Sequence, residues 1–231
     1  MSWLIWKEYR VNRLILLVGL GLLLVPHLIA LIVTLRHPDQ WEECFRASTG
    51  SSFFLTQIVL PLLGGNAIAG ERNDRSAEFL ACLPFSRWQN LISKLVLAPL
   101  VAVAICSVNF VFLLFVLGEE VSTHEIIAHF QRRPGDLIVP ACYVVTPLVF
   151  FCVGWLFSSF LKSAVFSSAA GLITPFVVIW CVYGMALWLK IDDHDQNFEF
   201  FMACWYAGLC FVLSMVSFIV GSCYYLRRVE P

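Results

Sequence analysis

The chain has 231 residues, of which 60% are hydrophobic and only 13% are charged. A soluble globular domain is about half apolar and about a quarter charged, so this composition indicates a protein that lies in a lipid bilayer. The formal net charge is −1 and the chain has no basic tract, which argues against a nucleic-acid partner.

The first thirteen residues mix aromatic with basic side chains over about three helical turns. Trp3, Trp6 and Tyr9 alternate with Lys7 and Arg10. Tryptophan prefers the headgroup level of a membrane, and basic side chains reach the lipid phosphates. We therefore expect residues 1–13 to form an amphipathic helix along the membrane surface. The alternative is that they simply extend the first membrane span.

Six apolar stretches are long enough to cross a membrane, which takes about 20 residues. They cover about 14–35, 53–69, 95–118, 137–161, 164–189 and 201–226. Only Lys162 and Ser163 separate the fourth stretch from the fifth, so either this turn is tight or the helices extend out of the bilayer. The fold class that this pattern predicts is an all-α integral membrane protein with six transmembrane helices.

The distribution of Lys and Arg predicts the orientation. With six spans the two termini share a side, and ten of the 15 basic residues fall there. That side, with residues 70–94, is expected to be cytoplasmic. The outer loops would be 36–52, 119–136 and 190–200, which are short and acidic. Residues 1–231 therefore read as a single multi-pass membrane domain.

No catalytic, cofactor-binding or metal-binding residue is predicted. The expected spans contain no Asp, Glu, Lys or Arg, which argues against an ion-coupled carrier. His27 is the one titratable candidate near mid-membrane, and a lone His beside a proline is more often a packed, hydrogen-bonded residue than a proton relay. His124 and His129 have no metal-ligand context, and no phosphate-binding P-loop occurs. Small residues at spacings such as Ser217/Gly221 and Ala164/Ser168 favour packing within the chain over a dimer seam.

The segment between the second and third stretches is polar. Charged residues come first, an apolar face follows, and Pro84 then ends any helix because proline lacks an N–H group. We expect a cytoplasmic helix over 71–83. Ser86 is a plausible N-cap for the next helix, which would begin near Arg87.

This segment resembles the coupling helix of ABC-2 type permeases, the membrane subunits of ATP-binding-cassette exporters, which often reads close to G-E-[RK]-x-x-G-T-x-E-x-L-L-x-x-P-x-S-R with a later lysine. The matching residues are Gly70, Glu71, Arg72, Glu78, Phe79, Leu80, Pro84, Ser86, Arg87 and Lys94. Arg75 and Ser76 depart from the family's Gly-Thr. The opening Trp6–Arg10 also resembles the family's WKE-R start.

The resemblance implies a permease subunit without enzymatic activity, in the cytoplasmic membrane of a prokaryote. It would export a substrate with ATP that a separate cytosolic ATPase binds and hydrolyses. A second permease copy or homologue would complete the transporter. The residues expected to dock on the ATPase are Glu71, Arg72, Asp74, Arg75, Glu78, Phe79, Leu80, Leu83 and Arg87, with Lys162 as a second, smaller contact. An intramembrane enzyme and a non-transport membrane assembly factor are the alternatives. An interior without charge suits a lipid, an amphipathic drug or a peptide as the substrate.

Overall fold

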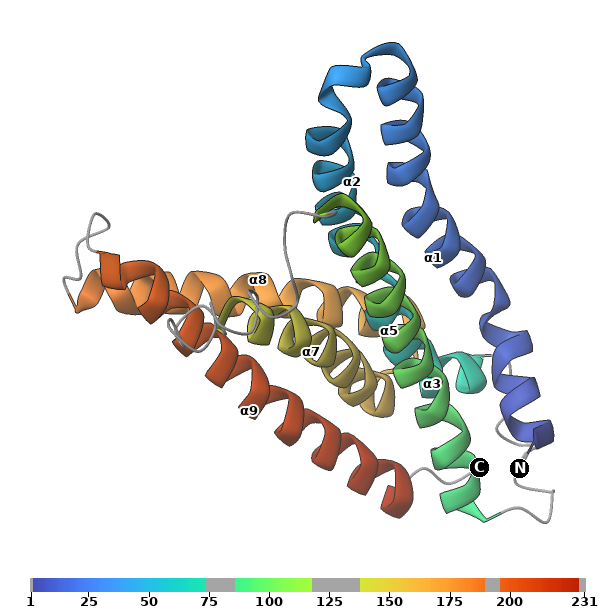
Figure 1. Cartoon of the computed structure of the whole chain (residues 1–231). Helices are drawn as coiled ribbons and strands as arrows, with labels where there is room; N and C mark the ends of the chain where they lie inside the picture. The colour runs from blue at the N-terminus through green and yellow to red at the C-terminus, as the bar shows by residue number, and fades with distance from the viewer. Residues whose placement is uncertain (1, 74–85, 118–137, 190–195, 229–231) are drawn as a thin grey trace. The chain divides into compact units, whose positions relative to one another are not determined.

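The structure is a computed structural model that describes residues 2–73, 86–117, 138–189 and 196–228 (Figure 1). Every element formed by these residues is helical. The elements are α1 (Ser2–Arg36), the short 3-10 helix η1 (Pro38–Gln40), α2 (Trp41–Thr56), α3 (Val59–Asn73), α5 (Arg87–Leu117), α7 (Ile138–Phe160), α8 (Ala164–Trp188) and α9 (Gln196–Arg228). The chain forms two compact units: the first holds α1, α2 and α5, and the second holds nearly all of α3 with α7, α8 and α9.

Five helical segments in the described ranges are long and apolar enough to cross a membrane. One of them is the η1–α2–α3 segment, Pro38–Arg72, and α7 contributes a shorter apolar stretch over Val144–Phe160. Large apolar side chains cover the outer faces, including Leu14 at 71% exposure and Val165 at 76%. Polar side chains such as Ser158 and Ser214 lie inside. An apolar exterior of this extent around a partly polar interior suits a lipid environment.

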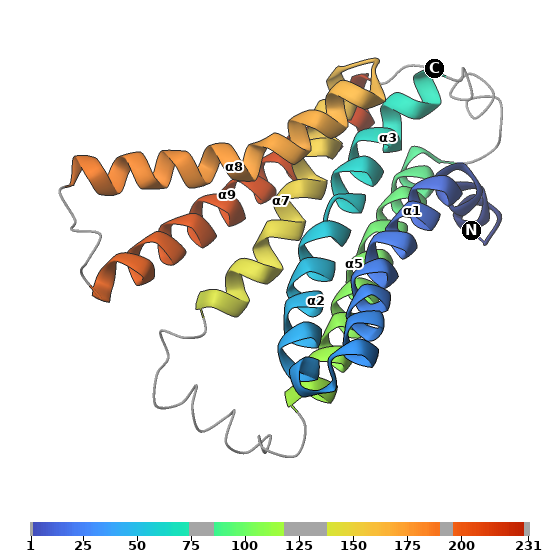
Figure 2. The same ribbon diagram turned by 90° about the horizontal axis from the view of Figure 1, so that it is seen from above.

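The first unit is a three-helix arrangement in which α2 runs antiparallel to α1 (Figures 1 and 2). The Leu23 carbonyl of α1 accepts a hydrogen bond from Ser52 of α2, and Gly19 packs on Val59. Residue numbers therefore decrease along α1 as they increase along its partner, which makes the two antiparallel. A methyl group on Gly19 would lie 2.6 Å from the Val59 Cγ2, so only glycine allows this approach. By contrast, contacts from the two ends of α1 to the two ends of α5 show that these helices run in the same direction.

Helix α2, Trp41–Thr56, corrects the expected outer loop at 36–52, because these residues are helical apart from a short junction at the start. Its polar face is buried at Ser48, Thr49, Ser52 and Thr56. The Ser52 hydroxyl donates to the Leu23 carbonyl at 2.9 Å, and the Thr56 hydroxyl donates to the Ser52 carbonyl at 2.7 Å. A search for apolar stretches misses such a helix because its inward face is polar, while its hydroxyls are satisfied by carbonyls of the helices.

Helix α1 also differs from the expected boundaries. It is continuous from Ser2 to Arg36, so the structure places no break between an N-terminal surface helix and the first span. Residues 2–13 are the first turns of α1, as in the alternative interpretation. Trp3, Trp6 and Tyr9 remain about half exposed, and the Arg10 guanidinium lies 5.3 Å from the centre of the Trp6 ring. The aromatic and basic pattern is therefore present, but on the end of a longer helix.

The second unit contains α7 and α9 running in the same direction. Thr146 pairs with Tyr206 near their starts, and Phe160 contacts Tyr224 near their ends. Helix α8 runs back along α7 after a tight turn at residues 161–163, one of the two arrangements that the sequence allows, and its bounds agree with the expected fifth span. The three helices lie side by side in Figure 2.

Small residues bring the helices of the second unit close together. A methyl group on Gly221 of α9 would lie 2.7 Å from the Trp155 Cδ1 atom, and one on Gly171 of α8 would lie 2.9 Å from the Phe150 carbonyl oxygen. Ser168 similarly packs against Gly65 of α3. Gly221 and Ser168 are thus used for packing within the chain, as expected.

Candidate functional site

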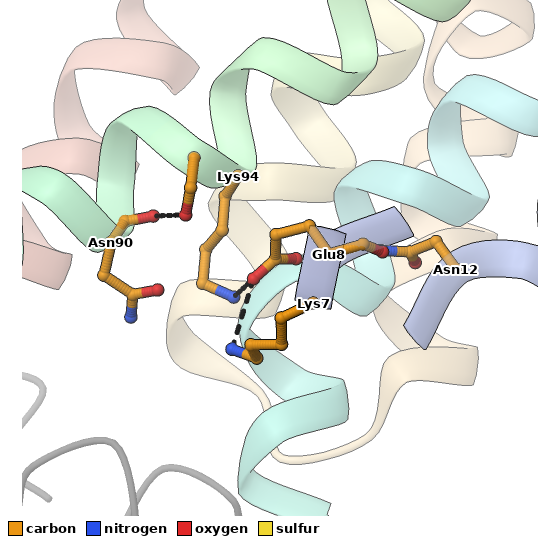
Figure 3. A network of polar contacts seen from close by, with 6 residues as sticks. Lys7, Glu8, Asn12, Asn90 and Lys94 are labelled. Carbon is orange, nitrogen blue, oxygen red and sulfur yellow. Dashed lines mark hydrogen bonds and ion pairs between the residues drawn. The ribbon is translucent and has the colours of Figure 1, made fainter. Parts of the chain in front are cut away.

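A buried ion pair joins the start of α1 to the start of α5 in the first unit (Figure 3). The Lys94 ammonium group donates to the Glu8 carboxylate, with 3.2 Å between Nζ and Oε1. The two side chains are only 1% and 4% exposed. Lys7 approaches the same carboxylate oxygen at 3.3 Å from a more exposed position. Glu8, the one acidic residue among the first thirteen, therefore serves two lysines.

The start of α5 is fixed by a capping box just before Lys94. The backbone N–H of Gln89 donates to the Ser86 hydroxyl at 3.2 Å, and the backbone N–H of Ser86 donates to the Gln89 side-chain oxygen at 3.1 Å. The reciprocal bonds satisfy two backbone donors that the helix itself leaves unpaired. The prediction that Ser86 caps a helix beginning near Arg87 is confirmed, and this cap sets the position from which Lys94 reaches Glu8.

In the second unit the end of α3 is bonded to the end of α7. The Arg72 guanidinium donates to the Ser159 carbonyl at 2.9 Å. Ser159 lies in the last turn of α7, where carbonyl groups have no partner within the helix and the helix dipole favours a cation. Lys162 follows three residues later and is exposed in the turn to α8. The structure thus brings together two predicted docking positions, Arg72 and Lys162, that are 90 residues apart in the sequence.

The other predicted docking residues are described only in part. Glu71, beside Arg72, is buried at 8% exposure. Arg87 is the first residue of α5. Outside the described residues lie Asp74, Arg75, Glu78, Phe79, Leu80 and Leu83. The expected helix over 71–83 is described only to Asn73, where α3 ends, so these residues remain predictions.

The sequence indicates the charged residues of these contacts but not what they pair with. Glu8 belongs to the WKE-R start and Lys94 to the coupling-helix motif, and neither motif predicts their pairing across 86 residues. The lone carboxylate in a basic N-terminal segment was the available signal, because a buried charge requires a partner. The Ser159 carbonyl carried no signal in the sequence, since any residue at the end of α7 would offer the same backbone group.

His27 lies in the first unit as a packed residue. It is 5% exposed, and its ring stacks on Phe112 with 3.9 Å between centroids. Its Nδ1 lies 3.1 Å from the Ser48 hydroxyl, which itself donates to the Phe45 carbonyl at 2.8 Å. Since the hydroxyl has one hydrogen, Nδ1 is the donor to Ser48. Among the described residues, no cluster of three or more His, Cys, Asp or Glu could hold a metal ion.

These features define a multi-pass helical membrane protein with charged contacts near its helix ends. A comparison with family models then supplies the class of membrane protein. A model described as "ABC-2 family transporter protein" matches residues 36–197, which is more than half of the chain. The chain belongs to this family, as its resemblance in the coupling segment indicates. Proteins of the family are membrane components of transporters, generally without catalytic activity of their own, and normally work with an ATP-binding subunit. Searches of the curated proteins and of the solved structures gave no match.

Proposed function

We propose that the chain is a six-span permease subunit whose cytoplasmic side carries residues 71–87 and Lys162, and that these residues dock on a separate ATPase. The observation that carries the proposal is the tie between Arg72 and Ser159. This hydrogen bond holds the end of α3, which precedes the predicted coupling segment, against the end of α7, which precedes the turn to α8.

The distribution of charge within each unit supports this orientation. In the first unit, the parallel α1 and α5 place Lys7, Arg10 and Lys94 toward one end. In the second unit, the ends of α3, α7 and α9 carry Arg72, Lys162 and Arg227. Basic residues concentrate on the cytoplasmic side of membrane proteins. Each unit therefore has one end of cytoplasmic character, and the predicted docking residues belong to these ends.

The proposed mechanism uses two contacts with the ATPase. The charged residues of 71–83 would set the register of a polar interface, and Phe79, Leu80 and Leu83 would provide its apolar anchor. Lys162 would make the second contact. Because Arg72 bonds α3 to α7, a displacement of the coupling segment would reach both helices at once. ATP hydrolysis belongs to the partner in this proposal, and the chain contributes the path for the substrate, together with a second permease.

A pull-down from mild detergent tests the docking. The tagged full chain is expressed with the ATP-binding-cassette ATPases of its host, in wild-type form and with Glu78→Lys and Lys162→Glu together. Charge reversal is expected to lower ATPase recovery about tenfold, because like charges across an interface are repelled. Glu43→Lys is the matched control, since Glu43 is exposed in the first turn of α2, within the expected outer loop.

Each outcome bears on a different part of the proposal. If the double variant still recovers the ATPase, the docking site lies elsewhere in the chain and the transporter proposal stands. Failure to retain any ATPase, under conditions in which a known exporter keeps its own, overturns the permease proposal and favours an assembly factor or an intramembrane enzyme. Direction of transport is tested separately with inside-out vesicles, in which export appears as ATP-dependent uptake.

A further inference from the structure

Cys142 of α7 and Cys204 of α9 lie next to one another in the second unit. The Cys142 thiol donates to the Ala203 carbonyl, with 3.5 Å between Sγ and the oxygen. A planar trans peptide places the Cα atom of the next residue about 2.8 Å from that oxygen. The Cys204 Cα is therefore within about 6 Å of the Cys142 sulfur.

The register of α7 and α9 holds the two cysteines at the same level. Toward the opposite ends, the hydroxyls of Thr146 and Tyr206 are 2.9 Å apart, and beyond them Cys210 packs in an apolar core with Val149 and Val153. These successive contacts align the parallel helices and limit sliding. A disulfide requires Cα atoms about 4.4–6.8 Å apart. The Cys142 sulfur is already held against the α9 backbone one residue before Cys204, so the bond would form by side-chain rotation with a small helix shift.

Access distinguishes this pair from the buried cysteines on the same helices. Cys142 and Cys204 are both half-buried, near the start of α7 and the start of the apolar stretch of α9. Cys152 and Cys210 are buried, so an oxidant cannot reach them without opening the helix packing. All eight cysteines in the described part of the chain are free.

We propose that Cys142 and Cys204 form an oxidisable thiol pair that closes to a disulfide and ties the start of α7 to the start of α9. The oxidant is a disulfide of a small molecule or a protein. One thiolate attacks it, forming a mixed disulfide and releasing one thiol of the oxidant. The second cysteine then attacks the sulfur of the first, forming the Cys142–Cys204 bond and releasing the other thiol. Two cysteine thiols are oxidised, and one oxidant disulfide is reduced to two thiols.

In the proposed orientation this pair lies on the side of the membrane away from the cytoplasm. Disulfides persist on that side because the environment there is oxidising. The disulfide itself does not depend on transport. It requires only the geometry of the second unit, so failure of the permease proposal and failure of this one are distinguishable.

The experiment treats the purified full chain in detergent with oxidised glutathione, blocks remaining thiols with N-ethylmaleimide, and maps peptides by mass spectrometry without reduction. Oxidation is expected to yield a peptide linking Cys142 to Cys204. Cys142→Ser and Cys204→Ser should each abolish that linkage, whereas Cys210→Ser on the same helix as Cys204 should retain it.

The wild-type map decides the proposal even if a variant fails to fold. Both cysteines carrying maleimide after oxidation, both carrying glutathione, or a linkage that joins either of them to a different cysteine would each overturn it. Blocking thiols in intact cells before lysis then shows whether the bond is present there. A bond that reforms after dithiothreitol is removed confirms a reversible pair.

Discussion

The ion pair between Glu8 and Lys94 allows a quantitative prediction about stability in the first unit. The change is Glu8→Gln, which keeps the shape of the side chain and removes its charge. At 3.2 Å, the distance between Lys94 Nζ and Glu8 Oε1, the Coulomb attraction is about 5 kcal/mol for an effective dielectric constant of about 20. Desolvation offsets much of this in the intact pair, but removal of one partner leaves a buried charge and costs about 3–5 kcal/mol.

Lys7→Gln is the matched comparison because Lys7 contacts the same carboxylate oxygen from a 15% exposed position. Its loss leaves Glu8 paired with Lys94, so we expect a cost of no more than about 1 kcal/mol. Glu8→Gln removes the carboxylate beside Lys94 at 1% exposure, whereas Lys7 lies in a more exposed position. The two substitutions at one contact therefore separate a buried pair from a superficial one.

Thermal unfolding in detergent, followed by circular dichroism and by thiol accessibility, measures the difference. For a chain of this size about 1 kcal/mol shifts Tm by about 2–4 °C, so Glu8→Gln should lower Tm by about 6–20 °C. The exchange Glu8→Lys with Lys94→Glu should recover part of the loss. Equal Tm values for Glu8→Gln and Lys7→Gln would refute the reasoning, because the stabilisation would then not depend on burial of the pair.

Three further predictions follow from packing, capping and charge. Gly221→Ala should lower Tm measurably because its methyl group meets the Trp155 ring. Gly208→Ala on the same helix should leave Tm unchanged, because nothing lies within 4 Å of the added methyl group. Equal shifts would contradict the packing argument. Ser86→Ala should cost about 1 kcal/mol through loss of the cap, read as a Tm shift, and an unchanged Tm would exclude a stabilising cap. A C-terminal green fluorescent protein should fluoresce and a C-terminal alkaline phosphatase should be inactive, since the proposed orientation places this terminus in the cytoplasm; the reverse pattern would invert the topology.

Predictions from apolar length succeeded where the helix faces are apolar and the ends are marked. The expected spans 137–161 and 164–189 agree with α7 and α8 within a residue, and the two-residue polar interruption between them forms a tight turn. The Ser86 cap was equally predictable, because a Ser followed three residues later by Gln satisfies two donors at a helix start. These features depend on local sequence, which is why one sequence suffices to predict them.

The errors in the predicted helix boundaries have a different cause. A segment can remain helical and hydrogen-bonded although its average hydropathy is too low to mark it as part of a span. Residues 2–13 join α1 because nothing in that segment breaks a helix, although their polarity suggests a boundary. The polar segment Trp41–Thr56 is helical because Ser52 and Thr56 bond to carbonyls and its acidic residues lie in the first turn, where the helix dipole favours them. Lipid exposure is thus a property of one face, whereas a hydropathy scan averages all faces.

The candidate site was predictable in its residue types and not in its pairings. Glu8, Arg72 and Lys94 were all recognisable from their motifs, but a motif does not say which charge meets which carbonyl or carboxylate. Helix direction supplies that information: once α1 and α5 run in parallel, a carboxylate near one start and an ammonium near the other can meet. Burial then requires the two charges to pair. An unpaired charge at that depth would cost several kcal/mol per ion, which is comparable to the whole free energy of unfolding of a folded domain. The pairing of Glu8 with Lys94 therefore follows from the fold, whereas the bounds of α7 and α8 follow from the local sequence.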